Sequence, residues 1–129
     1  MESEKLIKSN YKKISRKNKT AKERFKTYII RIYKTRSNKK QSNFNLTTEK
    51  IIELSYQNCY YCGKPPSNFY RVKEEIVYYS GLDRIDSSKG YTRTNVVSCC
   101  KQCNQAKSNL SQKQFSQHIS KILKHLNIL

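Results

Sequence analysis

Cys59-Tyr60-Tyr61-Cys62 and Cys100-Lys101-Gln102-Cys103 are two C-x2-C pairs, and they set the expected fold of this chain. Four thiolates at this spacing are typical of a closed, tetrahedral zinc site. The pairs are separated by residues 63–99, which are 37 residues, whereas simple zinc ribbons have about 15–20 there. The sequence therefore predicts a zinc site with a functional segment inserted between its two halves.

The fifth cysteine, Cys99, raises the question of which thiol binds the metal. Cys100 has the x2 spacing to Cys103, whereas Cys99 would give x3, so we expect Cys100 to be the ligand and Cys99 a packed free thiol. An odd number of cysteines also argues against a secreted disulfide framework. Because four protein ligands leave no open position, the predicted zinc ion is structural. The alternative is four unrelated buried cysteines.

The charge of the chain points to a polyanionic partner. Its 27 Lys and Arg against nine Asp and Glu give a net charge of +18, and bound phosphates would release condensed counterions. No apolar run approaches the roughly 18 residues of a membrane span, and no signal peptide opens the chain. Nucleic acid is therefore expected rather than a membrane, in an intracellular protein (cytoplasmic, or inside the host cell if viral).

The positive charge is concentrated at the N-terminus. Residues 1–40 carry fifteen Lys and Arg and three Glu. Apolar residues at helical spacing predict a helix near 20–35, preceded by a shorter one, and a polar break at 37–43. We expect residues 1–43 to be a basic helical DNA-binding arm and residues 44–129 a second domain; the alternative is a merely solvated helix face. The expected phosphate contacts are Lys12, Lys13, Arg16, Lys17, Arg24, Arg31, Arg36, Lys89, Arg93 and Lys107.

The rest of the chain predicts alternating helices and strands. Thr47 is a candidate N-cap for a helix with Ile51, Ile52 and Leu54 on its apolar face. The further predicted elements are a turn at 63–66, a strand at 75–80 continuing into 81–86, a turn at 89–91, a short strand at 95–98, a helix opening at 104–107 and a helix at 112–126. The last helix is expected to bury Phe115, Ile119, Ile122, Leu123 and Leu126.

Four short motifs lie in a fixed order along the segment that contains the second cysteine pair. They are Gly81-Leu-Asp83-Arg84-Ile-Asp86, Gly90-Tyr91-Thr92, Asn95-Val-Val and Cys100-Lys-Gln-Cys103-Asn104-Gln-Ala-Lys107. With both cysteine pairs they resemble the HNH endonucleases, and more narrowly the cysteine-knuckle HNH proteins of phages, mobile elements and large viruses. The resemblance covers about residues 46–122.

The resemblance implies a fold and an activity. The fold is α+β: a small ββα-metal core, in which a hairpin packs on a helix around one divalent cation, with a four-cysteine zinc site and flanking N- and C-terminal helices. The implied activity is hydrolysis of phosphodiester bonds in double-stranded DNA, leaving 5′-phosphate and 3′-hydroxyl ends. Residues 44–129 would then be the nuclease domain.

The resemblance also assigns residues. Asp83 and Asn104 would be the ligands of Mg²⁺ or another divalent cation, which prefers oxygen donors. Asn95 would brace the loop by hydrogen bonds to its backbone. The family has a general-base His where this chain has Arg84.

Arg84 cannot replace that histidine as a base. A guanidinium with a pKa above about 12 accepts no proton at neutral pH, so we expect it to bind the scissile phosphate and stabilise developing negative charge. Tyr91 is the leading candidate base, and Tyr78, Tyr79 and Asp86 are alternatives. The two histidines, His118 and His125, are interpreted as partly exposed helix residues.

A second interpretation of the same residues is a zinc-knuckle DNA-binding protein that has lost catalysis with its histidine. The intact Asp83 and Asn104 favour the enzyme. A restriction, homing, packaging or junction-resolving role is left open. Cutting a palindrome would require a homodimer, for which the terminal helix is a candidate interface; alternatively, that helix covers the core.

Overall fold

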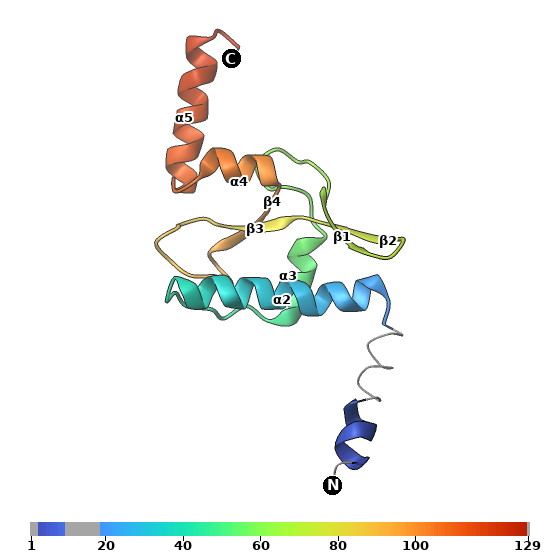
Figure 1. The fold of residues 1–129 in the computed structure, drawn as a ribbon. Helices are drawn as coiled ribbons and strands as arrows, with labels where there is room; N and C mark the ends of the chain where they lie inside the picture. The colour runs from blue at the N-terminus through green and yellow to red at the C-terminus, as the bar shows by residue number, and fades with distance from the viewer. Residues whose placement is uncertain (1–2, 10–18, 129) are drawn as a thin grey trace.

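The computed structural model describes residues 3–9 and 19–128 of the chain. After a helical segment at residues 3–9, the elements are α2 (Ala21–Lys39), α3 (Thr48–Ser55), β1 (Asn68–Val72), β2 (Glu75–Tyr79), β3 (Gly81–Arg84), β4 (Val96–Cys99), α4 (Lys101–Lys107) and α5 (Gln112–His125) (Figure 1). The strands form two separate antiparallel pairs, β1–β2 and β3–β4. This is the α+β fold that the sequence predicted.

The predicted ββα unit is formed by β3, β4 and α4. Strand β3 pairs with β4 so that Asp83 lies opposite Val97 and Arg84 opposite Val96. The chain passes from β4 directly into α4, whose N-cap is Cys100. In Figure 1 this hairpin lies between α4 and α2. Helix α4 begins three residues before Asn104, where the sequence placed its opening.

Helix α2 supplies the centre of the hydrophobic core. It begins with a capping box between Thr20 and Glu23, which satisfies backbone donors at the helix start. Phe25, Ile29 and Tyr33 repeat every four residues and are at most 2% exposed, so they form one buried stripe. The cluster they join also contains Leu46, Ile51, Leu54, Leu82, Tyr91 and Val96.

Residues 21–39 therefore pack against the segment that the sequence assigned to the second domain. Helix α2 also continues to Lys39, through part of the predicted break at 37–43, and the Ser37 hydroxyl donates to the Ser42 carbonyl at 2.7 Å. The DNA-binding role expected for residues 1–43 stays a prediction, and residues 10–18 lie outside the described part of the chain.

Hydrogen bonds to α2 and to α3 help to attach the ββα unit to its surroundings. The Leu82 N–H of β3 donates to the Tyr33 hydroxyl of α2 at 2.9 Å, and the Ser98 hydroxyl of β4 donates to the Leu54 carbonyl of α3 at 2.6 Å. Burial raises the pKa of Tyr33 to about 12, so its hydroxyl stays protonated at neutral pH. Helix α3 begins at the predicted N-cap Thr47, whose hydroxyl accepts the Lys50 N–H at 3.2 Å.

The β1–β2 hairpin contains one strand that was predicted and one that was not. Strand β2 lies within the predicted 75–80, whereas β1 alternates half-buried Asn68, Tyr70 and Val72 with exposed residues. The ring centroid of Tyr70 lies 5.9 Å from Phe25 and 4.7 Å from Tyr28, both on α2. Because the inward face of β1 is polar and aromatic, its alternation is weak in sequence.

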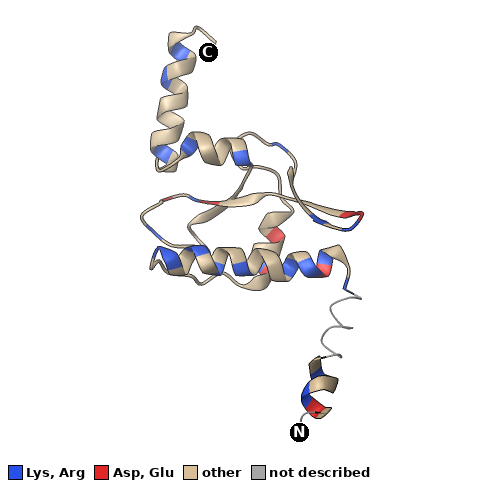
Figure 2. Ribbon diagram, viewed as in Figure 1, with Lys and Arg blue, Asp and Glu red and all other residues tan. Residues whose placement is uncertain are grey.

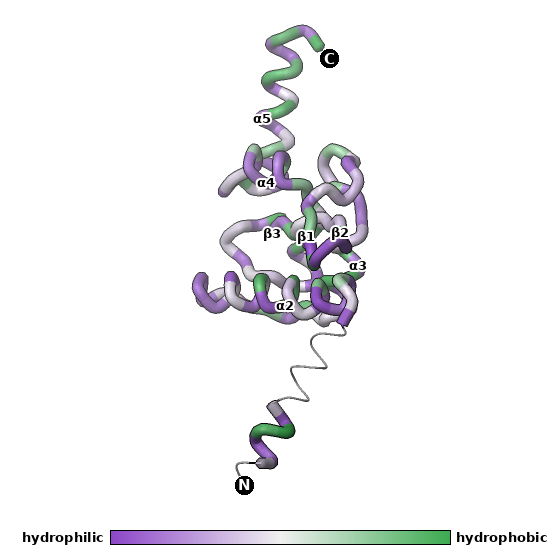
Figure 3. Tube along the Cα trace, turned by 45° about the vertical axis from the view of Figure 1, so that its right-hand side comes forward, coloured by the Kyte–Doolittle hydropathy of each residue, from purple (hydrophilic) through white to green (hydrophobic). Residues whose placement is uncertain are grey.

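Helix α5 does not have the buried face that the sequence predicted. Phe115 is 6% exposed and its ring meets the Tyr61 ring edge-on at 5.4 Å. Leu123 is half-buried, whereas Ile119, Ile122 and Leu126 are exposed. Figures 1 and 3 show why: only the start of α5 lies on the body of the molecule, and the rest extends away from it. The expectation of a fully covered apolar side was wrong.

Lys and Arg residues occur in several elements of the fold, with many on α2 (Figure 2). The helix carries seven Lys and Arg and a single acidic residue, Glu23. Among the residues that the structure describes, no helix is both long enough and apolar enough to cross a membrane.

The loop between β3 and β4 is docked on the segment after α2 by a glycine. Gly90 is buried, and a Cβ atom there would overlap the backbone of Asn43. Next to it, the Asn45 N–H donates to the Tyr91 carbonyl at 3.2 Å, and the Arg93 N–H donates to the Asn45 side chain at 3.0 Å. Residue 90 must therefore lack a side chain for these segments to meet.

We predict that Gly90→Ala lowers the free energy of unfolding by about 3 kcal/mol, as expected for overpacking against backbone. Urea denaturation followed by circular dichroism measures this loss. Gly81→Ala is the matched control, because its added Cβ would lie at an ordinary 3.4 Å from the nearest atom; the free energy of unfolding should change by less than about 1 kcal/mol. Equal losses for the two variants would contradict the packing argument.

Candidate functional site

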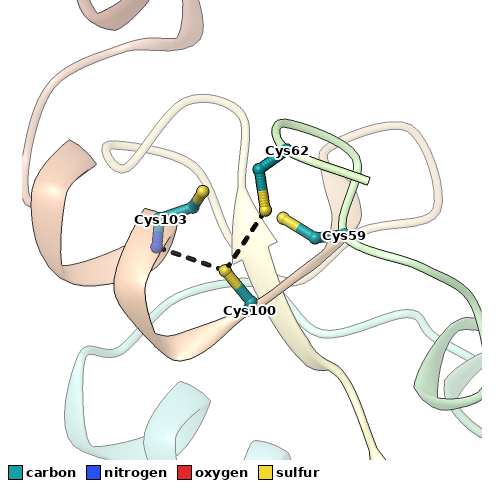
Figure 4. A group of neighbouring side chains, drawn as sticks. All are labelled: Cys59, Cys62, Cys100 and Cys103. Atoms are coloured by element: carbon teal, nitrogen blue, oxygen red, sulfur yellow. Dashed lines mark hydrogen bonds between the residues drawn. The ribbon is translucent and has the colours of Figure 1, made fainter. Parts of the chain in front are cut away.

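Four cysteines form a cluster that fits a zinc ion (Figure 4). The Sγ atoms of Cys59, Cys62, Cys100 and Cys103 all lie within 4.8 Å of one another, and those of Cys62 and Cys100 are 3.7 Å apart. A tetrahedron with Zn–S distances of about 2.3 Å separates its sulfurs by roughly 3.8 Å. The two pairs that the sequence predicted to bind zinc are thus brought together from opposite ends of the inserted segment.

Backbone hydrogen bonds shape the first half of this cluster. The Gly63 N–H donates to the Cys59 carbonyl at 2.9 Å, and Gly63 has φ of 75°, which favours glycine. Burial raises the pKa of the Cys59 thiol, but backbone N–H donors from Cys100, Cys62 and Tyr61 outweigh it and bring that pKa down to about 6. A thiolate, the form that binds zinc, is therefore favoured at Cys59.

Cys99 is excluded from the cluster, as its spacing indicated. It is 1% exposed, and its thiol donates to the Cys100 carbonyl at 3.3 Å. Burial, with the neighbouring Cys59, raises the pKa of Cys99 above its usual range. It therefore packs as a neutral thiol.

Asp83 takes part in a buried ion pair. The Tyr61 hydroxyl donates to its Oδ2 at 2.7 Å, and the Lys107 Nζ lies 3.3 Å from each carboxylate oxygen. Lys107 is completely buried and also donates to the Arg84 carbonyl at 2.9 Å. Burial raises the pKa of Tyr61, and its hydrogen bond to Asp83 raises it further, so the tyrosine remains a donor. This set of contacts joins the end of α4 to β3.

This geometry corrects the role expected for Lys107. A side chain with no exposed surface cannot reach a phosphate, so the expectation that Lys107 contacts DNA was wrong. The sequence motif includes Lys107, but its spacing does not show that the ammonium binds Asp83 and the Arg84 carbonyl inside the protein. Tyr61 was missed as well, because nothing in the Cys-x2-Cys spacing distinguishes it from Tyr60.

The two residues expected to bind Mg²⁺ lie on neighbouring elements of the ββα unit. Asp83 is on β3 and the exposed Asn104 is on α4, and both have oxygen donors of the kind that Mg²⁺ prefers. Both oxygens of Asp83, however, are already held by Lys107 and Tyr61. The donor set fits a divalent cation in kind, but an ion at Asp83 has to compete with the ammonium.

Arg84 and the candidate base Tyr91 are in contact. The Arg84 guanidinium lies 5.3 Å from the centre of the Tyr91 ring and donates to the Lys89 carbonyl at 3.1 Å. Tyr91 also packs against Tyr33, with ring centroids 5.3 Å apart. Tyr91 is only 6% exposed, which limits its access to an attacking water.

Asn95 holds the loop that follows Arg84. Its side-chain oxygen accepts the Asp86 N–H at 2.9 Å, and its amide donates to the carbonyls of Asp86 at 3.0 Å and Gly90 at 2.9 Å. Within the same loop, hydrogen bonds from the hydroxyl and N–H of Ser88 lower the pKa of Asp86. Asp86 is therefore an ionised, half-buried carboxylate within the loop that Asn95 fixes.

The two other tyrosines considered as bases lie on β2. Tyr78 is 56% exposed on the outer face of the β1–β2 hairpin. The Tyr79 ring packs against Phe25 in a tilted arrangement, with ring centroids 4.9 Å apart, and burial raises the pKa of Tyr79 to about 12. Both belong to a different hairpin from Arg84. His118 and His125 are exposed on α5.

The remaining expected DNA contacts are divided by exposure. Arg31, Arg36, Lys89 and Arg93 are exposed, and Arg24 is half-buried. Lys12, Lys13, Arg16 and Lys17 lie outside the described residues.

Comparisons with known proteins identify the fold. No family model matches the chain. Uncharacterized protein R423 of Acanthamoeba polyphaga mimivirus is 35% identical over 77 residues, which are 60% of this chain and 13% of that protein. The solved structure of the rare-cutting HNH restriction endonuclease PacI is similar with a TM-score of 0.55 and 22% identity, covering 79% of this chain and 81% of that one. The chain therefore shares the HNH endonuclease fold, in agreement with the sequence motifs.

We predict that Cys62→Ser removes the bound zinc and most of the thermal stability, because a structural zinc site contributes on the order of 10 kcal/mol to folding. Zinc per chain is measured by atomic emission on the purified protein. Cys62 is exposed, so the change itself removes little packing. Cys99→Ala is the control and should keep its zinc. If Cys99→Ala lost its zinc while Cys62→Ser kept it, Cys99 would be a zinc ligand and Cys62 would not.

We predict that Lys107→Met lowers the free energy of unfolding by about 3–5 kcal/mol, because it leaves the Asp83 carboxylate buried without its cationic partner. Adding Asp83→Asn to it should recover part of this loss. Mg²⁺ should raise the melting temperature of the single variant more than that of the wild-type chain, because it no longer competes with the ammonium. Equal stability of the Lys107→Met and wild-type chains would contradict the ion pair.

Proposed function

We propose that this chain, which has the HNH fold, is an endonuclease that hydrolyses phosphodiester bonds in double-stranded DNA with the help of a divalent cation. The observation that supports the proposal is the ββα unit, which contains the residues that the sequence motifs single out: Asp83 and Arg84 lie on β3, and Asn104 lies on α4. A strongly basic chain and a structural neighbour that is an HNH restriction endonuclease support the choice of DNA.

Asp83 and Asn104 are the proposed protein ligands of the cation. When bound, such an ion neutralises charge on the phosphate and lowers the pKa of a bound water. Because the Asp83 carboxylate is held by Lys107, cation binding is proposed to depend on how readily that ammonium is displaced. Metal binding by this chain is therefore expected to be weaker than at a free carboxylate.

Arg84 is proposed to bind the scissile phosphate. Its guanidinium already donates one hydrogen bond, to the Lys89 carbonyl, and lies over the Tyr91 ring, which leaves further N–H donors for phosphate oxygens. A fixed guanidinium stabilises the charge that develops as water attacks phosphorus and the bond to the 3′ oxygen breaks.

The proton of the attacking water must pass to a base. Tyr91 was the leading candidate, but its low exposure counts against it. Asp86 is half-buried and so more exposed than Tyr91, and its lowered pKa keeps it ionised at neutral pH, although a carboxylate of low pKa is a weak base. Exposure favours Asp86, and comparing Tyr91→Phe with Asp86→Asn separates the two.

A DNA-binding protein without catalytic activity is the second candidate function. One observation favours it: the Lys107–Asp83 pair already neutralises the carboxylate that a nuclease of this fold would use. Such a protein would keep the zinc cluster and the exposed basic residues, and it would bind DNA without cutting it.

We predict that the purified chain nicks supercoiled plasmid in the presence of Mg²⁺ or Mn²⁺ and not when no divalent cation is added. Asn104→Ala should lower the cleavage rate at least about 100-fold, and Arg84→Ala about 100- to 1,000-fold. Gel electrophoresis measures nicking, and fluorescence anisotropy measures DNA binding.

Gln102→Ala is the matched control, because it removes an exposed amide from the same helix as Asn104. It should leave cleavage unchanged. DNA binding without nicking by any divalent cation would exclude the nuclease and leave the second candidate.

A further inference from the structure

A groove runs between α2, the start of β1 and α4, next to the candidate site. Its cavity volume is about 580 Å³, and Asn104 is among the residues that line it. Ligand pockets of this size hold one small molecule or one unit of a polymer. The groove is therefore too small for a duplex and large enough for a single nucleotide.

The lining of this groove is complementary to a nucleotide. Arg36 and Lys101 supply two cations, Asn68 and Gln105 supply amides, and Phe69 supplies an aromatic ring. No Asp or Glu is among the lining residues that the structure describes. Cations suit phosphate, amides suit the edges of bases, and rings suit their faces.

Phe69 is the residue that most needs an explanation. It is 65% exposed on β1, opposite the exposed Tyr78 of β2. The other face of the hairpin packs on α2, so the Phe69 ring does not contribute to the core. An exposed ring at the edge of a cationic groove is positioned to stack on a base.

Arg36 is held at this groove by a contact of its own. Its guanidinium lies 5.4 Å from the centre of the Tyr33 ring, and Tyr33 is fixed to β3 by the hydrogen bond from Leu82. The cation is therefore supported on a buried side chain, which reduces the entropy lost when a phosphate binds.

We propose that this groove binds one unpaired nucleotide of the DNA substrate, with Phe69 stacking on the base and Arg36 and Lys101 contacting phosphates. The inference rests on the proposed function for its substrate class, and Asn104 places the nucleotide beside the proposed cleavage site. The protein would then separate or select an unpaired base close to the bond that it cuts.

The test compares two fluorescein-labelled DNAs: a duplex of about 20 base pairs, long enough for several phosphate contacts, and the same duplex with a short central single-stranded gap of thymidines. Fluorescence anisotropy at one fixed salt concentration gives both dissociation constants for the full chain with its zinc. The wild-type chain should bind the gapped DNA about ten-fold more tightly, because an unpaired base is free to stack on Phe69. Thymidines suffice, because such stacking is sequence-tolerant. Phe69→Ala should reduce this ratio to about one, whereas Phe69→Trp should keep it.

Tyr78→Ala is the matched control, because it removes another exposed ring (56% against 65% for Phe69) from the same hairpin, and this ring does not line the groove. It should leave the ratio unchanged. A wild-type ratio of one, or an undiminished ratio in Phe69→Ala, overturns the inference. Plasmid nicking without a preference for the gap would retain the nuclease and reject the groove, and a Phe69-dependent preference without nicking would do the reverse.

Discussion

The Lys107 ammonium is the point at which α4 is fixed to β3, and the geometry of the candidate site depends on it. A helix of seven residues is too short to be stable alone. Its first end is held by Cys100, which is both the N-cap and a member of the four-cysteine cluster. Its last residue is held by the buried contacts of Lys107 with Asp83 and the Arg84 carbonyl. One end thus belongs to the four-cysteine cluster and the other is held by an ion pair, and Lys107 is the one buried residue of this helix.

The second constraint is the alternation of β3. Successive side chains of a strand point to opposite faces, and the contacts of β3 follow this rule. Asp83 meets Lys107 of α4, whereas Leu82 joins the core cluster with α2, and Arg84 contacts Tyr91. The acid and the guanidinium are adjacent in sequence but belong to different surroundings. Under the proposed function, they can act on one phosphate only near the end of the strand, where Arg84 is the last residue.

The parts of the fold that could be predicted are those encoded by local spacing. The cysteine pairs, the Thr47 cap and the strand before Asp83 each depend on residues within a few positions of one another. The partners of Asp83 come from 22 and 24 residues away in sequence, and no spacing rule relates them. The positive charge of the sequence was equally uninformative about position, because it does not distinguish the buried Lys107 from the lysines at the surface. Amphipathicity also failed for α5, because a face that is apolar in sequence is buried only where the fold provides something to cover it.

Helix α2 shows why the basic segment and the nuclease-like core are difficult to separate physically. Its buried stripe is the centre of the core, and the same helix carries seven Lys and Arg but only one acidic residue, Glu23. Like charges at this density repel one another and weaken the folded state. A bound polyanion would remove that repulsion and stabilise the helix that the core requires. Tyr33 and Arg36 lie about one helical turn apart and join the structural role of α2 to its proposed DNA-binding role. The Tyr33 hydroxyl is hydrogen-bonded to β3, and the Arg36 guanidinium lies over the Tyr33 ring at the groove. Under the proposed function, DNA binding by Arg36 of α2 would therefore stabilise the contact between Tyr33 and β3, and no movement of separate domains is required.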